Sequence, residues 1–151
     1  DWTLIGQVKN NPRMHIPIIG NGDITSPQQA KDYFDRYGVD AIMVGRATFG
    51  CPWIFADIKN HLFPDMPPIP SPTGNMAACV EVLKEHVNRA IEWCGNDERK
   101  GIVHSRRHFA ASPIFKGLAD FKQTRIALLR ADTKEEVFSI MDEIVTKWGN
   151  S

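Results

Sequence analysis

The sequence predicts an α/β segment followed by an all-α domain, the first part being the last two βα units of a TIM-type (β/α)8 barrel. Two observations predict the barrel units: apolar runs end in glycine-rich polar residues at 16–23 and 41–47, and a helix signal lies between them. In such barrels the loops after strands seven and eight frequently hold a phosphate. A third observation, repeated helical patterns after residue 75, predicts the all-α domain.

The chain is shorter than a complete barrel. It has 151 residues, whereas the whole fold takes about 250. Because the chain begins with Asp1 and enters as if mid-fold, we expect a fragment of a longer protein. The longest uncharged run, 66–80, contains four prolines, so no membrane helix is predicted, and no signal peptide is visible. The composition, 42% apolar and 24% charged, is typical of a globular protein that we expect in the cytoplasm.

The first barrel unit has clear start and stop signals. Residues 2–9 are predicted to end a helix, and the nearly continuous apolar run 14–20 predicts a buried parallel strand. Ser26 can cap the next helix with Pro27 at its first position, and Gly38 suits a left-handed stop.

The second unit follows at once. Residues 40–45 predict a strand, 46–49 a short helical turn, and 52–61 a further helix. Five prolines then crowd into nine residues, and their fixed φ angles predict a semi-rigid linker. The expected organisation is a barrel segment over 1–63, a linker over 64–74 and a helical domain over 75–151.

Four helices are expected in the helical domain. The first is predicted to bury one apolar face and to end at Gly95, and Asn96 or Asp97 can cap the second, which Pro113 limits. The third lies near 119–129 and is expected to bury Phe121, Ile126 and Leu129. Thr133 and Glu136 have the spacing of a capping box at the start of the fourth.

The glycines at the two strand ends indicate phosphate binding. Gly22 and Gly45 have no Cβ, so an anion can approach their backbone, and amides at a helix start donate to it. Arg46 adds a planar fork that suits two phosphate oxygens. The alternative is that these are ordinary turns and a surface arginine.

These motifs resemble a known family. Ile-Pro-Ile-Ile-Gly-Asn-Gly-Asp-Ile at 16–24, Gly-Val-Asp-Ala-Ile-Met-Val-Gly-Arg-Ala at 38–47 and Gly-Cys-Pro-Trp-Ile-Phe at 50–55 are similar to the FMN-binding end of tRNA-dihydrouridine synthases. Lys100-Gly101, Arg106-Arg107-His108 and Phe115-Lys116-Gly117 resemble the tRNA-binding bundle of the same family, in its bacterial, nitrogen-regulation-protein-like branch.

The resemblance implies an oxidoreductase of tRNA processing, a flavoprotein that reduces uridine in tRNA to 5,6-dihydrouridine with FMN, recharged by NADPH. It assigns the FMN phosphate and ribityl chain to Asn21, Gly22, Asp23, Gly45 and Arg46. The catalytic cysteine and flavin-contacting residues of the family lie on earlier strands. No catalytic residue is therefore expected in this chain, and the chain alone is expected to be inactive.

The basic block fits an RNA partner. Residues 99–130 hold eight Lys or Arg and one acid, although the whole chain has zero net charge. Such cations neutralise backbone phosphates without reading sequence. The expected RNA-binding residues are Lys100, Arg106, Arg107, His108 and Lys116. Phe109 and Phe115 could stack on a base or lie in the core.

No metal site is predicted. The three cysteines are widely spaced and include no C-x-x-C pair, which argues against zinc and against a disulfide framework. His104 and His108 are four residues apart, but two arginines between them would repel a cation. Cys51 follows the last strand, which is the wrong place for the family's acid.

Two other functions stay open at this point. Another FMN-dependent TIM-barrel oxidoreductase, such as one like dihydroorotate dehydrogenase, shares the phosphate loops but gives no reason for the basic helices. A non-catalytic RNA-binding helical module would make the α/β part structural. Two strands alone leave an uncovered edge, so the truncated barrel is also expected to dimerise, swap or lean on the helical domain.

Overall fold

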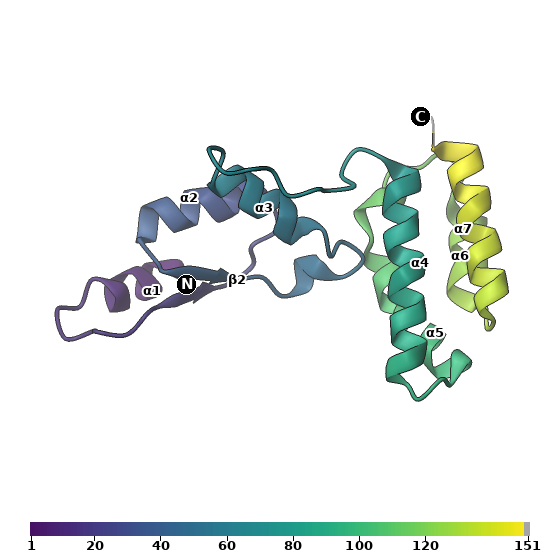
Figure 1. The fold of residues 1–151 in the computed structure, drawn as a ribbon, viewed down its shortest axis with the longest axis horizontal. Coiled ribbons are helices and arrows are strands. Elements are labelled where there is room, and N and C mark those ends of the chain that lie inside the picture. Colours follow the sequence, from purple (N-terminus) through teal and green to yellow (C-terminus); the bar gives the residue numbers. More distant parts are fainter. Residues whose placement is uncertain (150–151) are drawn as a thin grey trace. The chain divides into compact units, whose positions relative to one another are not determined.

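The chain forms two compact units in the computed structural model, which describes residues 1–149 (Figure 1). The first unit contains residues 1–48 and 52–71, and the second contains 49–51 and 72–151. Residues 150 and 151 of the predicted helical domain lie outside the described residues. No sequence signal pointed to the membership of 49–51 in the second unit.

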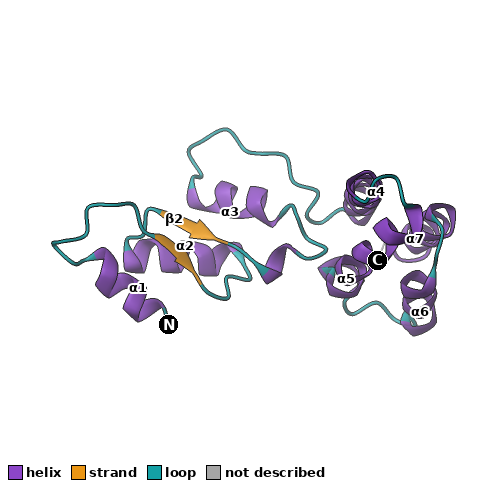
Figure 2. Cartoon of the chain, turned by 90° about the horizontal axis from the view of Figure 1, so that it is seen from below, coloured by secondary structure: helices purple, strands orange, loops and turns teal. Residues whose placement is uncertain are grey.

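The first unit alternates helices with two short strands (Figure 2). Strands β1 and β2 run parallel, and Ile19 pairs with Ala41, Gly20 with Ile42 and Asn21 with Met43. The order of elements agrees with two βα units. They are α1 (Trp2–Lys9), β1 (Ile19–Asn21), α2 (Pro27–Tyr37), β2 (Ala41–Met43), η1 (Arg46–Thr48) and α3 (Ile54–Leu62).

The predicted ends of α2 are confirmed. The Ser26 hydroxyl accepts a hydrogen bond from the Gln29 amide, and Pro27 occupies the first turn. Gly38 ends the helix in the left-handed region with φ of 63°. These local signals place α2 between the two strands, as two consecutive βα units require.

The first strand is shorter and more exposed than predicted. It begins at Ile19 instead of residue 14, since Pro17 has no amide hydrogen for a sheet ladder. Ile19 and Met43 are 61% and 57% exposed, so the prediction of a buried strand was wrong. The sheet has only two strands among residues 1–149, and no described element covers the face of the sheet on which Ile19 and Met43 lie.

Trp2 organises the core of the first unit. Its ring lies 4.8 Å from that of Tyr33 and 5.8 Å from that of Tyr37, measured between centroids. Its indole Nε1 donates to the Gly22 carbonyl at 2.8 Å. A Cβ at Gly20 would lie 2.3 Å from the Trp2 ring, so this strand position has room only for glycine.

The second unit contains the four predicted helices. Asp97 caps the second of them, and the capping box of Thr133 and Glu136 is present, as predicted. The buried side chains of α4, α5 and α7 form the core between them. The elements are α4 (Met76–Trp93), α5 (Glu98–Ala111), η2 (Pro113–Phe115), α6 (Lys122–Arg130) and α7 (Lys134–Trp148).

The buried face of α6 differs from the predicted one. Leu128 is buried, whereas Ile126 and Leu129 are half-buried. Phe121, which is buried as predicted, packs on the Phe115 and Trp148 rings. Leu128 lies two helical turns later, on the same face as Phe121, which explains why it faces the core.

Candidate functional site

The two predicted phosphate loops line one open pocket of about 680 Å³. Strand β1 ends at Asn21 and strand β2 at Met43, and these two residues are paired in the parallel register. The loops that follow therefore leave the sheet side by side. All five residues assigned to the cofactor line this pocket, namely Asn21, Gly22, Asp23, Gly45 and Arg46.

Gly22 and Gly45 have different surroundings, so the absence of a side chain has a different consequence at each of the two positions. Gly22 has φ of 150°, and a Cβ there would lie 3.1 Å from Trp2 Nε1, so packing on Trp2 already favours glycine. No atom lies within 4 Å of the position of a Gly45 Cβ. Open space at Gly45 leaves its backbone accessible to a ligand from the pocket. Thr48 closes this turn, because its hydroxyl and its amide both donate to the Gly45 carbonyl.

Arg46 and Asp23 join the two loops. The Arg46 Nη2 donates to the Asp23 carboxylate in an ion pair, and both side chains are mostly exposed, at 82% and 76%. Asp23 adopts φ of 45°, an uncommon conformation for a residue other than glycine. A guanidinium has five N–H donors, so pairing with one carboxylate oxygen leaves donors for an anion. Arg46 therefore keeps N–H donors beyond its pair with Asp23, at a pocket that the backbone of both loops also lines.

The predicted RNA-binding residues divide into two kinds. Lys100, Arg107 and Lys116 have exposed side chains. Arg106 and His108 are less exposed and hold parts of the helical unit together. Arg106 Nη2 donates to the Ala131 carbonyl at 3.1 Å and to the Asp132 carboxylate at 2.8 Å.

His108 anchors the segment 49–51. Its Nδ1 accepts a hydrogen bond from the Gly50 amide at 3.2 Å, and its ring lies 5.5 Å from the Phe49 ring. Burial, then the nearby His86 and Arg107, lower the pKa of His108 to about 4. His108 is therefore neutral at pH 7, which suits its role as acceptor. The Arg107 guanidinium lies over the Phe49 ring at 5.3 Å.

Sequence reasoning missed Gly50 and Ser112 at this anchor. The buried Ser112 hydroxyl donates to the Gly50 carbonyl at 2.7 Å. Gly50 has φ of 65°, and a Cβ there would lie 2.1 Å from the His108 carbonyl oxygen. In the sequence, Gly50 belongs only to the motif 50–55 that resembles the family. Ser112 sits between a helix end and Pro113, a place where a serine is unremarkable in sequence.

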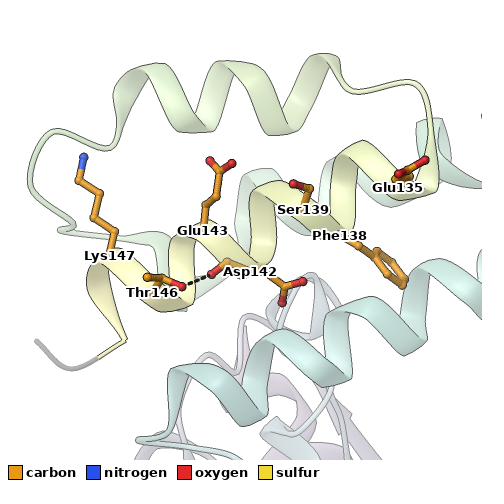
Figure 3. Close-up of a pocket in the computed structure, with 7 residues that line it drawn as sticks. All are labelled: Glu135, Phe138, Ser139, Asp142, Glu143, Thr146 and Lys147. Atoms are coloured by element: carbon orange, nitrogen blue, oxygen red, sulfur yellow. Dashed lines mark hydrogen bonds between the residues drawn. The ribbon is translucent and has the colours of Figure 1, made fainter.

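A further pocket on α7 has the wrong charge for a phosphate (Figure 3). Three carboxylates line it, against a single cation, Lys147. The carboxylates belong to Glu135, Asp142 and Glu143. Asp142 also accepts from Lys84, whose pKa is lowered by burial but raised overall by hydrogen bonds to Asp142 and Glu81.

Comparison with known proteins identifies the family. The sequence model of the dihydrouridine synthase (Dus) family matches residues 1–146. The chain belongs to the dihydrouridine synthase family. This confirms the resemblance drawn from the strand-end and helix motifs, and a Dus domain implies a TIM-barrel fold. The two parallel strands with their helices are consistent with part of such a barrel.

Curated relatives have names that agree with this family. The chain is 32% identical over 148 residues to tRNA-dihydrouridine synthase B of Shewanella oneidensis, covering 94% of this chain and 41% of that protein. It is 29% identical over 147 residues to a probable tRNA-dihydrouridine synthase of Rickettsia prowazekii, covering 94% and 43%. With the Escherichia coli K12 tRNA-dihydrouridine synthase B it shares 41% identity over 98 residues, 64% of this chain and 28% of that protein.

The chain spans about two fifths of the length of the first two relatives. Among residues 1–149 no helix is long and apolar enough to cross a membrane. The same residues contain no group of three or more His, Cys, Asp or Glu side chains placed to hold a metal ion.

Proposed function

We propose that this chain is part of a flavin-dependent tRNA-dihydrouridine synthase that reduces uridine in tRNA to 5,6-dihydrouridine. In this proposal, residues 1–63 are the last two βα units of the FMN barrel, 64–74 link them to the rest, and 75–151 bind tRNA. The observation that carries the proposal is the pocket shared by the loops after β1 and β2, in a chain of the Dus family.

FMN is the cofactor that the pocket suits. The Gly45 backbone is open to the pocket, and Arg46 offers N–H donors to phosphate oxygens. Each hydrogen bond to a charged phosphate contributes about 1.5–3 kcal/mol. Asn21, Gly22 and Asp23 are proposed to hold the phosphate and ribityl chain from the other loop, with Asp23 orienting Arg46. When bound and reduced by NADPH, FMN would supply the hydride for the uracil ring.

The helical unit is proposed to hold the tRNA. Lys100, Arg107 and Lys116 are exposed cations suited to backbone phosphates. Arg106 and His108 belong to the family motif, but both are engaged in hydrogen bonds within the helical unit. We propose that they stabilise this surface and do not contact the RNA themselves. A target uridine must leave its stack to reach a flavin. We place the protein in the cytoplasm, where tRNA is modified.

This chain is proposed to position the cofactor and the tRNA without performing the chemistry. It contains none of the residues to which the family resemblance assigns proton donation and flavin contact. Cys51 is buried in the helical unit rather than placed at the phosphate pocket. The 151-residue chain by itself is accordingly expected not to reduce uridine.

Arg46→Ala tests the cofactor assignment in the full-length protein that contains this chain. Loss of the guanidinium removes one or two charged hydrogen bonds, so the affinity for FMN is expected to fall about 10- to 100-fold. Quenching of flavin fluorescence measures that affinity, and the dihydrouridine content of tRNA measures activity. Arg36→Ala is the matched control, because Arg36 is exposed in the last turn of α2 and does not line the pocket. Unchanged FMN affinity in Arg46→Ala would contradict the assignment.

A further inference from the structure

A second cluster of cations lies on the helical unit, between the end of α5 and the start of α6. Lys116, Lys122 and Arg125 line a pocket of about 390 Å³ there. No carboxylate lines this pocket. None of the three side chains forms an ion pair with any residue of 1–149. The pocket is therefore strongly positive, unlike the acidic pocket on α7.

The floor of the pocket is aromatic and closed. Phe109, Phe115 and Phe121 line it and are buried, at 2%, 8% and 6% exposure. Phe115 is stacked on Phe121 with 5.4 Å between ring centroids, so the pair already packs within the fold. An apolar floor lowers the local dielectric and strengthens the attraction of the rim cations for an anion. The pocket suits an anionic group and offers no free ring face for a base.

Arg125 is held in place for such a ligand. Its Nη2 donates to the Ala110 carbonyl at 3.2 Å, which fixes the guanidinium beside the end of α5. The remaining N–H donors of a guanidinium form a planar fork that matches two phosphate oxygens. Lys116 and Lys122 add two compact charges to the lining of the same pocket. A phosphate diester has one negative charge and two free oxygens, which this donor set can satisfy.

We propose that Lys116, Lys122 and Arg125 form a socket for one backbone phosphate of the RNA substrate. This inference rests on the proposed function and extends its RNA-binding surface from α5 to α6. Lys122 and Arg125 belong to the basic block 99–130, but they lie outside the motifs that resemble the family and are not among the five residues named there as RNA-binding. The same chemistry would also accept free inorganic phosphate, and the experiment separates these two sources.

The test is tRNA binding by the full-length protein with Lys122→Ala and Arg125→Ala combined. Losing one phosphate contact is expected to weaken binding about tenfold at 0.1 M salt. It should also reduce the slope of log affinity against log salt by about 1, the value for one neutralised phosphate. FMN affinity should be unchanged. The matched control is Arg89→Ala with Lys147→Ala, which removes two exposed cations of the same unit that do not line the pocket.

The outcomes are distinct. A tenfold loss and a smaller salt slope in the pocket variant, with the control unchanged, support the socket. Wild-type affinity and slope in the pocket variant overturn it, and so does equal weakening in the control, which would indicate only general charge. If the variant binds tRNA normally but loses inorganic phosphate in a titration, the pocket is a free-ion site. If the wild-type protein does not bind tRNA, the proposed function fails, and the socket fails with it.

Discussion

At the scale of single residues, Gly50 is constrained by hydrogen bonds and by packing at once. Its amide and its carbonyl are both bonded to side chains of the helical unit, His108 and Ser112. Its φ is positive, and its missing Cβ leaves room for the backbone of α5. One glycine therefore bonds with the buried Ser112 hydroxyl and the half-buried His108 ring, and it allows a close approach of two backbones.

Gly50→Ala is expected to destabilise the helical unit by about 3 kcal/mol or more, since strain and a backbone clash add together. Gly95→Ala is the control, because Gly95 also has a positive φ, of 72°, but no atom lies within 4 Å of its Cβ position. Gly95→Ala should lower the free energy of unfolding by only about 1–2 kcal/mol. Chemical denaturation followed by circular dichroism measures both losses. Equal losses in the two variants would show that the contact with α5 contributes nothing.

Gly50 also shows what sequence can and cannot predict at this scale. The position of Gly22, Gly45 and Arg46 in strand-end loops could be predicted, because each follows an apolar strand signal within a few residues. The partners of Gly50 lie 58 and 62 residues away in sequence. A contact of that separation leaves no local pattern, so only the fold reveals it.

At the scale of elements, helix ends were predictable and strand extents were not. Ser26, Asp97 and Thr133 each accept a hydrogen bond from the amide three residues later, in their own helix, so the signal is local. The bounds of β1 depend on pairing with β2, more than twenty residues later. The buried face of α6 likewise depends on which helix it packs against. For that reason Leu128 is buried, and not Leu129 as predicted.

The packing of α4 on α5 brings two histidines together. His86 and His108 rings lie 4.0 Å apart, and burial lowers the pKa of both, with Arg107 adding to the effect. Both rings are therefore neutral in the folded unit near pH 7. Protonating either would place a second positive charge beside Arg107 and, at His108, would remove the acceptor for Gly50.

This pair predicts a loss of stability in mild acid. The unfolded chain takes up protons near pH 6.5, the ordinary histidine pKa, whereas folded His108 resists until about pH 4. The unfolded state thus binds more protons between these values, and the stability of the unit falls as pH falls through that window. Hydrogen exchange of α5 amides at pH 7 and pH 5 measures it. The variant His108→Asn keeps a hydrogen-bond acceptor but does not titrate, so it should lose less stability between pH 7 and pH 5 than the wild type. An equal loss of stability in the two proteins would exclude His108 as the cause.

At the scale of the whole molecule, charge is unevenly distributed over a chain that is neutral overall. Basic side chains gather on α5 and around the start of α6, whereas carboxylates line the pocket on α7. An RNA partner would be attracted to the first region and repelled by the second. Although the total charge is zero, the helical unit thus has one region that attracts an anionic partner and one that repels it.

The exposed strands predict self-association of the isolated 151-residue chain. Ile19 and Met43 present apolar side chains on a two-stranded sheet that no described element covers. Strands with open edges tend to pair with other copies. Sedimentation is expected to show association that grows with concentration, and Ile19→Lys with Met43→Lys should reduce it. Phe55→Lys with Phe63→Lys, exposed positions off the sheet, is the control, and a strictly monomeric wild-type chain would contradict this prediction.

The membership of residues 49–51 in the helical unit limits how the protein can be dissected. A bundle expressed from the proline-rich stretch onward would lack Phe49, Gly50 and Cys51, leaving Ser112 and the His108 Nδ1 without their Gly50 contacts. Conversely, the first unit cut at the same place would carry residues 49–51, whose partners have been removed. Gene truncation at the proline-rich stretch would thus damage both products. Recombination between relatives should tolerate a crossover there only when the two parents match at residues 49–51 and at His108 and Ser112.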